Sequence, residues 1–296
     1  MRTKSDKQWA FVGHIIMICL TICAIAPFIL LITASLTEEA TALRDGYSFF
    51  PAKWSLDAYG YIVKQWAVIG RSYLVTITVT AVGTLVGVSI SAMLAYVLSQ
   101  RDLPGRGVIL FLITFTMLFN GGLTSTYIIY TQVFHVKNTI FGLLLPNLLL
   151  NAYYVMMFRN YFENSIPKAL VEAAHIDGAS EMKIFRHIIV PLSLPMVASV
   201  SMIVALMYWN DWTNGLYYLS SNSKLQSIQT LLNNMNENIK FLQQNNNPAL
   251  SGAAVNIPSA TVRMAIAVVG IAPILLMYPF FQRWFVKGAT VGAVKE

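Results

Sequence analysis

The chain of 296 residues has few charged side chains: Asp, Glu, Lys and Arg make up 11% of it, against 56% for hydrophobic residues. Soluble domains carry roughly 25% charged residues. With a mean hydropathy of +0.59, this scarcity excludes an ordinary soluble domain and indicates a polytopic membrane protein. The net charge is +7, but no basic run with interleaved aromatic residues occurs, so we expect the excess in loops at a membrane and not on nucleic acid.

Groups used for catalysis and metal binding are also scarce. Cys19 and Cys23 lie four residues apart in the first apolar run, where a disulfide has poor geometry. No CxxC or His/Cys cluster predicts a metal site, and the four histidines are scattered. The sequence has neither a Ser/His/Asp arrangement at catalytic spacing nor a Gly-rich phosphate loop followed by Lys-Ser or Lys-Thr. We therefore expect no enzymatic activity, no metal and no bound cofactor in this chain.

Long apolar segments dominate the sequence, and a bilayer crossing needs about 20 such residues. Six segments are long enough, which predicts an all-α protein with one transmembrane domain over residues 1–296 and spans at about 11–36, 72–99, 107–130, 139–159, 191–219 and 261–285. Six crossings place both termini on the same side. If that side is the cytoplasm, the inner segments hold 12 Lys and Arg in 64 residues and the outer segments hold 8 in 87. The bias favours cytoplasmic termini.

The loop at 160–190, between predicted spans four and five, has an unusual internal order. Pro167 starts a predicted helix that Gly178 can end with a positive φ. Ser180 then caps a second predicted helix, Glu181 to Val190, which Pro191 is expected to close. Two short helices joined at a glycine make a compact hairpin, and its small residues allow a partner's backbone to approach closely.

This hairpin resembles the coupling motif of permease subunits of binding-protein-dependent ABC importers, in the version found in sugar importers. The resemblance rests on a set of residues at fixed spacing between 172 and 195, which comprises Glu172, Ala173, Ala174, Asp177, Gly178, Ala179, Ser180, Phe185, Pro191 and Pro195. The C-terminal run from Tyr278 to Lys295 is similar to the tail of sugar permeases. The likeness covers nearly the whole chain, and within the family the chain is similar to the smaller permease of maltose-type systems. Phe49-Phe50-Pro51 and the run at 231–235 point to the branch that serves oligosaccharide and polysaccharide-fragment importers of Gram-positive bacteria.

The resemblance implies a type I importer in the bacterial cytoplasmic membrane. In such an importer a second, homologous permease completes the pore, two cytoplasmic ATPase subunits hold ATP and Mg, and an extracellular lipid-anchored binding protein delivers an oligosaccharide. The hairpin would enter a cleft on one ATPase. Gly178 would set the angle between its helices, Glu172 and Asp177 would make polar contacts, and Ala173 and Ala174 would permit close packing.

Polar residues within the predicted spans are candidates for a substrate path. Asp211 is the most unusual, because a carboxylate in a span is costly and usually faces protein or water. The candidates are Asn120, Asn147, Asn151, Tyr208, Trp209 and Asp211. Aromatic faces and hydrogen-bonding groups suit a sugar, but Asp211 can equally be a structural polar contact near the outer interface, where Trp and Tyr are enriched.

Two other functions remain open from the sequence. One is a permease for a different small solute, against which the Asp-Gly-Ala-Ser form of the hairpin and the sugar-type tail argue. The other is a gating or scaffold subunit that carries no substrate itself. The sequence names neither the sugar nor the ATPase.

Overall fold

The computed structural model describes residues 4–146, 148–244 and 260–293, and side chains are described for most of these. Helices make up nearly all of the regular structure; within the described residues the only β pairing is an isolated antiparallel bridge between Thr37 and Trp54. The chain divides into two compact units, residues 1–69 with 232–273 and residues 70–231 with 274–296. We describe each by itself.

The first unit contains α1 (Lys4–Ser35), α2 (Glu39–Asp45) and α3 (Asp57–Lys64), with parts of α14 (Ile228–Gln244) and α16 (Ala260–Ala293). Glu39 joins elements far apart in sequence, because its carboxylate accepts hydrogen bonds from the backbone N–H groups of Ala260 and Thr261, both at 3.0 Å. A negative charge at a helix N-terminus satisfies free N–H groups and the helix dipole. Glu39 thereby fixes the start of α16.

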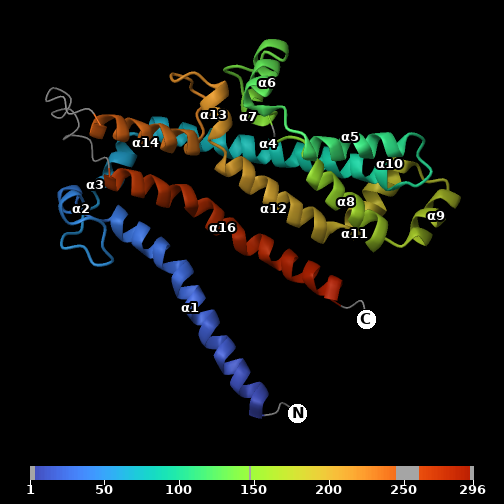
Figure 1. The fold of residues 1–296 in the computed structure, drawn as a ribbon, viewed down its shortest axis with the longest axis horizontal. Helices are drawn as coiled ribbons and strands as arrows, with labels where there is room; N and C mark the ends of the chain where they lie inside the picture. The colour runs from blue at the N-terminus through green and yellow to red at the C-terminus, as the bar shows by residue number, and fades with distance from the viewer. Residues whose placement is uncertain (1–3, 147, 245–259, 294–296) are drawn as a thin grey trace. The chain divides into compact units, whose positions relative to one another are not determined.

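The second unit is built around α4 (Trp66–Ser99), most of which belongs to it. The chain then forms α5 (Arg106–Leu118), α6 (Gly122–Ile128), the π-helical turn η1 (Ile129–Val133), α7 (Phe141–Leu144) and α8 (Ala152–Ser165). After the hairpin described below come α12 (Leu194–Asn210) and α13 (Thr213–Tyr218). The core of this unit includes Leu98 of α4, Phe158 of α8 and Val200 of α12, which are fully buried. Figure 1 labels these three helices.

The predicted spans correspond unequally to these helices. Among the described residues, three helices are long and apolar enough to cross a membrane: Trp9–Ser35, Trp66–Ser99 and Ala260–Met277. Two more spans follow if each bent pair counts as one, namely Arg106–Leu118 with Gly122–Val133, bent by 118°, and Glu181–Leu192 with Leu194–Asn210, bent by 83°. The segment at 139–159 holds α7 and the start of α8, separated by a non-helical stretch around Pro146. The count of six spans therefore stays a prediction.

Candidate coupling site

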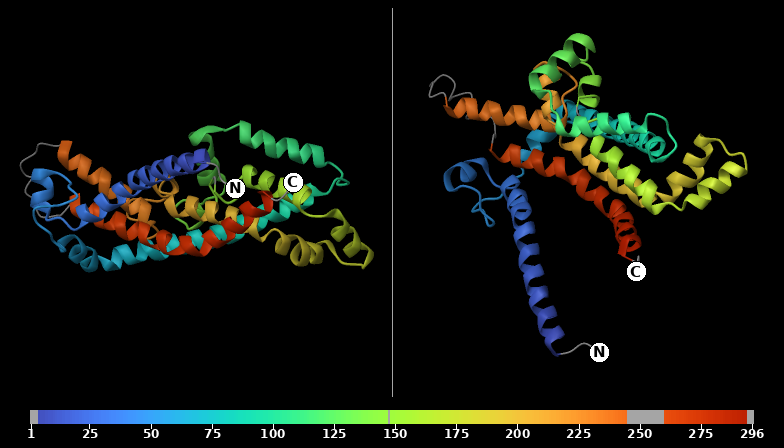
Figure 2. Two further views of the ribbon diagram at one scale, coloured as in Figure 1. Left: turned by 90° about the horizontal axis from the view of Figure 1, so that it is seen from below. Right: turned by 45° about the vertical axis from the view of Figure 1, so that its right-hand side comes forward.

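The loop after α8 folds into the helical hairpin that the sequence predicts. Its first helix is α9 (Lys168–Ile176). Its second helix is continuous from Glu181 to Leu192 and consists of α10 (Glu181–Ile184), the π-helical turn η2 (Phe185–Ile189) and α11 (Val190–Leu192). In both views of Figure 2 the hairpin stands at one end of its own unit.

The turn between the helices depends on one glycine. Gly178 has a φ of 75°, a region that side chains with a Cβ rarely adopt. The N–H of Ala179 donates to the carbonyl of Ala174 at 2.9 Å, and the N–H of Gly178 donates to that of His175 at 3.0 Å. These two bonds are the pair that ends a helix in a Schellman motif, in which the residue with positive φ is usually glycine. The prediction that Gly178 ends the first helix is confirmed.

The end of the second helix differs from the prediction. The sequence predicts that Pro191 closes this helix after Val190, because proline has no N–H to donate. Instead, the π-helical turn changes the bonding register: the N–H of Val190 donates to Phe185, and the helix continues to Leu192. The break comes at Ser193, whose N–H donates to Ile189 at 3.0 Å, and α12 follows after the 83° bend.

The tip of the hairpin is exposed. Glu172, Ala173, Asp177, Gly178 and Ser180 are all exposed, and Ala174 and Ala179 are half-buried. None of the side chains of α9 is buried against the described part of the chain, and Ile176 is 87% exposed. Leu170 and Met182 are also exposed large apolar side chains of the hairpin, so it presents apolar residues together with carboxylates and small residues.

The second helix supplies the attachment to the core. Ile184 and Ile189 are buried at 0% and 2% exposure, so this face of the helix packs into the unit. Phe185 is half-buried, and its ring lies 5.4 Å, between centroids, from that of Tyr96 on α4. With one helix exposed and the other anchored, the hairpin has the form of a projecting arm.

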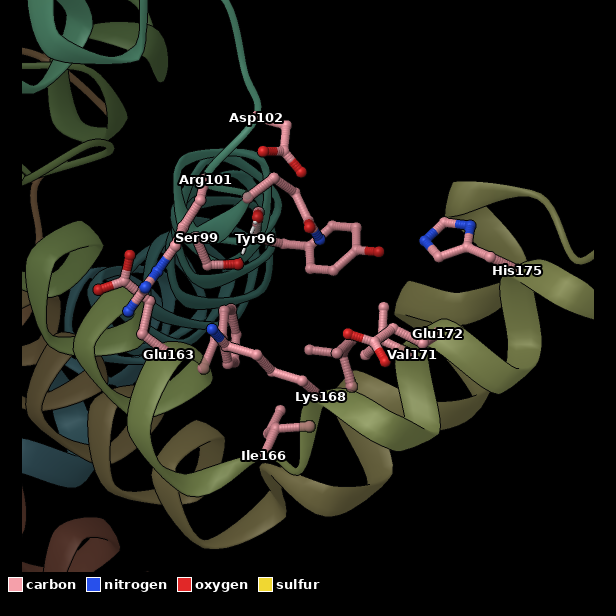
Figure 3. Close-up of a pocket in the computed structure, with 13 residues that line it drawn as sticks. Tyr96, Ser99, Arg101, Asp102, Glu163, Ile166, Lys168, Val171, Glu172 and His175 are labelled. Carbon is pink, nitrogen blue, oxygen red and sulfur yellow. Dashed lines mark hydrogen bonds between the residues drawn. The ribbon is translucent and has the colours of Figure 1, made fainter.

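Figure 3 shows the space between α9 and the end of α4. A cavity of about 340 Å³ lies there, and its lining brings Tyr96 of α4 and Lys168, Glu172 and His175 of α9 to one place. Glu172, predicted to contact an ATPase, thus borders this cavity while remaining exposed.

An ion-pair cluster that the sequence analysis did not predict fixes the base of the hairpin. Glu163, near the end of α8, pairs with Arg159 at 2.9 Å and with Arg106 at the start of α5. Arg106 also donates from Nε to the carbonyl of Leu98 at 2.8 Å. The sequence contains a signal for one of these two ion pairs, because Arg159 and Glu163 are four residues apart, a spacing that brings side chains together on a helix. The cluster joins the helix before the hairpin to the turn after α4.

Two of the candidate substrate-path residues, Tyr208 and Asp211, form hydrogen bonds within the chain where α12 ends. Tyr208 is 2% exposed and donates its hydroxyl to the carbonyl of Leu144 at 2.8 Å, and Trp209 is 5% exposed. One carboxylate oxygen of Asp211 accepts hydrogen bonds from the backbone N–H groups of Thr213 at 3.1 Å and Asn214 at 3.3 Å, the first residues of α13. These three candidates therefore lie together where α12 ends.

The remaining candidates lie at other breaks in the helices. Asn120 accepts a hydrogen bond from the N–H of Gly122 at 2.9 Å, at the bend between α5 and α6. Asn151 accepts one from Tyr153 at 2.9 Å and caps α8. Asn147 lies outside the described residues, as do the side chains of the C-terminal pattern from Gln282 to Lys295. The assignment of a substrate path stays a prediction.

No group of three or more His, Cys, Asp or Glu side chains that could hold a metal ion occurs within the described ranges. Cys19 and Cys23 are free thiols on α1.

Comparison with known proteins places this geometry in a family. The profile of "Binding-protein-dependent transport system inner membrane component" matches residues 73–291. The polygalacturonan/rhamnogalacturonan transport system permease protein YtcP of Bacillus subtilis is 38% identical over 283 residues, which cover 96% of each chain. Protein LplC of the same organism is 33% identical over 92% of this chain and 89% of its own.

A solved structure gives the same answer for the fold. A chain from the crystal structure of a bacterial ABC transporter involved in the import of the acidic polysaccharide alginate superposes with a TM-score of 0.81, at 28% identity, and the match covers 96% of this chain and 99% of that one. Subunits of this kind are membrane permeases, and a separate ATPase hydrolyses the ATP. The chain belongs to the family of inner membrane components of binding-protein-dependent transport systems.

Proposed function

We propose that this chain is a permease subunit of an ATP-driven ABC importer that moves an oligosaccharide, or a related carbohydrate, across the bacterial cytoplasmic membrane. The observation that carries the proposal is the exposed hairpin at 168–192, with its glycine turn, in a chain of this family. A transport subunit must also cross the bilayer, and the chain has helices long and apolar enough to do so.

The substrate class follows from the relatives. The names of similar permeases specify polygalacturonan and rhamnogalacturonan at 38% identity, arabinooligosaccharides at 28% and melibiose, raffinose and stachyose at 27%. All of these are carbohydrates with more than one sugar unit. A permease for an unrelated small solute has less support from these relatives.

Coupling to the ATPase would use the exposed tip of the hairpin. Glu172 and Asp177 would make polar contacts, and Ala173 and Ala174 would let the ATPase surface approach the helix closely. Ala179 and Ser180 continue this tip, whereas Phe185 and Pro191 belong to the anchored helix that would transmit its movement. ATP and Mg would be bound by the ATPase, and this chain would bind no cofactor.

The assembly follows the importer pattern. A second, homologous permease would complete the pore, two ATPase subunits would lie in the cytoplasm, and a lipid-anchored binding protein would deliver the sugar from outside. The hairpin must face the ATPase, so both termini and the hairpin would be cytoplasmic, in agreement with the charge bias of the loops.

Affinity purification in mild detergent tests the assignment. The wild-type chain should recover a second permease and an ATPase, and a variant that combines Gly178→Val with Glu172→Ala should lose the ATPase while keeping the second permease. Uptake of labelled fragments of polygalacturonan, rhamnogalacturonan and arabinan into proteoliposomes then tests the substrate class. Recovery of the wild-type chain alone, or of an ATPase that ignores the hairpin substitutions, would contradict the proposal.

A narrower role within the importer has a specific observation in its favour. Tyr208 and Asp211, two of the candidate path residues, already form hydrogen bonds inside the chain. In that arrangement this subunit would gate the pore while the second permease contacts most of the sugar. Alanine substitutions that change which sugar is imported would contradict this role, and changes in abundance alone would support it.

A further inference from the structure

One carboxylate beside the turn of the hairpin contacts two helices besides its own. Glu181 is the first residue of α10, and its two oxygens have different partners. Oε2 accepts a hydrogen bond of 2.6 Å from the hydroxyl of Tyr96 on α4, and Oε1 lies 3.4 Å from Nε2 of His175 on α9. This single side chain therefore joins three helices.

Tyr96 is buried, whereas its hydrogen-bond partner Glu181 is exposed. The tyrosine is 5% exposed, and its ring packs on Phe185, one turn beyond Glu181 in the same continuous helix. The side chain of Glu181 is 62% exposed and that of His175 is 42% exposed. Hydrogen bonds to a charged group are short and roughly twice as strong as those between neutral groups. The buried phenol thus fixes an exposed carboxylate at the start of the second hairpin helix, next to the turn.

This contact links elements that the chain itself does not join. The hairpin is covalently continuous with α8 before it and α12 after it, but 85 residues separate Tyr96 from Glu181. A displacement of the hairpin reaches α8 and α12 along the backbone. It reaches α4 through side chains, among which the Tyr96–Glu181 bond is a polar and directional contact.

The other end of α4 is tied to a different part of the same unit. The hydroxyl oxygen of Thr76 accepts a hydrogen bond from the N–H of Ile228 at 2.9 Å, where both groups are buried. Closer to the middle of the helix, Gly83 faces the ring of Tyr208 so closely that a Cβ there would lie 2.3 Å from it. α4 therefore spans from the hairpin to the start of α14 and the end of α12.

We propose that Tyr96 is a positioning residue for coupling: through Glu181 it fixes the hairpin to α4, so that α4 moves with the hairpin when the ATPase closes. The proposal rests on the proposed function, because it assigns the hairpin to the ATPase. It goes beyond that function by naming a second route of transmission, along α4 to Ile228, in addition to the backbone connection to α12.

The first test uses the complete importer in proteoliposomes with labelled polygalacturonan fragments as the probe. Tyr96→Phe removes one hydroxyl and keeps the ring on Phe185. We expect the ATPase to remain bound and ATP hydrolysis to continue, while sugar imported per ATP falls by about tenfold, the effect of losing one hydrogen bond to a charged group. Tyr73→Phe is the matched control, because this hydroxyl on the same helix makes no hydrogen bond within the described part of the chain.

A double-mutant cycle separates this route from a general loss of structure. If Tyr96 acts through Glu181, then Tyr96→Phe with Glu181→Ala should be no worse than either single change. Glu181→Gln, which retains an acceptor oxygen, should keep more of the coupling than Glu181→Ala. An unchanged ratio of sugar to ATP in Tyr96→Phe, fully additive effects, or loss of the ATPase from Tyr96→Phe would each overturn the proposal.

A second measurement depends on neither the ATPase nor the sugar. In the purified chain, spin labels are placed on Leu85→Cys and Ile176→Cys, two exposed positions on α4 and α9, with Cys19 and Cys23 replaced by alanine. We expect a narrow distribution of label distances in the parent and in Tyr73→Phe, and a broader one in Tyr96→Phe. Equal widths in all three would overturn the proposal even if the importer behaves as proposed. If no probe is imported by the parent complex, the assignment of substrate fails and the label distances still decide the role of Tyr96.

Discussion

The hairpin at 168–192 and the end of α12 both carry polar residues that the sequence indicates as candidate site residues. These side chains are exposed in the hairpin, whereas at the end of α12 they are hydrogen-bonded within the chain. In the hairpin, Glu172 and Asp177 are exposed on an element whose first helix has no buried side chain in the described structure. At the end of α12, Tyr208 and Asp211 are bonded to the chain's own backbone. Side chains left exposed are available to another protein, whereas side chains with internal partners hold the fold.

Gly178 in the hairpin and Gly83, which faces the end of α12, are constrained for different physical reasons. A Cβ added at Gly178 would meet no atom of the described structure within 4 Å, so the constraint on this residue is its backbone conformation alone. Gly83 has an ordinary helical conformation, and the constraint is the ring of Tyr208. Substitutions at the two glycines should therefore damage different properties, coupling in one case and stability in the other.

The largest effect is expected at Gly178. Valine, which is β-branched, is strained at a φ of 75°, whereas asparagine adopts this region more readily. Gly178→Val should reduce sugar uptake by roughly tenfold or more through misplacement of the hairpin helices, which corresponds to about 1–3 kcal/mol of backbone strain. Gly178→Asn should retain most of the uptake.

The measurement is uptake in proteoliposomes together with thermal unfolding of the purified complex. An unfolding midpoint close to that of the parent in both variants would show that the transmembrane helices are intact. Equal uptake by the valine and asparagine variants would show that the turn does not depend on the conformation of Gly178.

Substitution of Gly83 should lower the stability of the chain more than substitution of Gly178. In Gly83→Ala the new Cβ would lie 2.3 Å from the nearest ring carbon of Tyr208, so the ring or α4 must shift. Overpacking of this kind lowers the free energy of unfolding by about 1–3 kcal/mol. Gly107→Ala, at a helical glycine whose Cβ would meet no described atom within 4 Å, is the matched control.

Thermal unfolding of the purified chain in detergent measures the effect. The midpoint should fall in Gly83→Ala and stay near the parent value in Gly107→Ala. If both variants unfold like the parent, the contact between α4 and Tyr208 is looser than the structure indicates.

The hairpin could be predicted from the sequence because its determinants are local. The positive φ of Gly178 and the helix start at Glu181 depend on residues within a few positions of each other. The predicted end of the second helix was wrong because the π-helical turn at 185–189 lets the helix pass through Pro191. Ile184 and Ile189, at the two ends of this turn, are buried, and the local pattern does not show against which residues they pack.

Contacts between distant elements could not be predicted. Nothing near Tyr96 indicates that it meets Glu181, because the pairing depends on the packing of α4 against the hairpin. The apolar run at 139–159 also reads as one span, although the chain leaves the helix around Pro146. The carbonyls of Leu144 and Pro146 find partners in Tyr208 and Asn214, which lie more than 60 residues later. Hydropathy alone does not reveal such a break.

Tyr208→Phe tests whether the end of α12 serves stability or selection of the sugar. The change keeps the ring against Gly83 but leaves the buried carbonyl of Leu144 without its donor, which costs about 1–3 kcal/mol in the free energy of unfolding. Tyr73→Phe, which removes an unbonded hydroxyl of the described structure, should change the unfolding midpoint less. A changed preference among polygalacturonan, rhamnogalacturonan and arabinan fragments in Tyr208→Phe would instead place this hydroxyl in the sugar path.

The smallest effect is expected at Asp211, where a carboxylate bonds two N–H groups at the start of a helix of six residues. Asp211→Ala removes this cap and should lower the free energy of unfolding by about 1 kcal/mol. Asp211→Asn keeps an acceptor oxygen and should lose less, because asparagine caps helices about as well as aspartate does. If the charge itself served transport, asparagine would impair uptake as much as alanine does while leaving the unfolding midpoint unchanged. Uptake and unfolding measured together on the two variants therefore distinguish a cap from a residue of the substrate path.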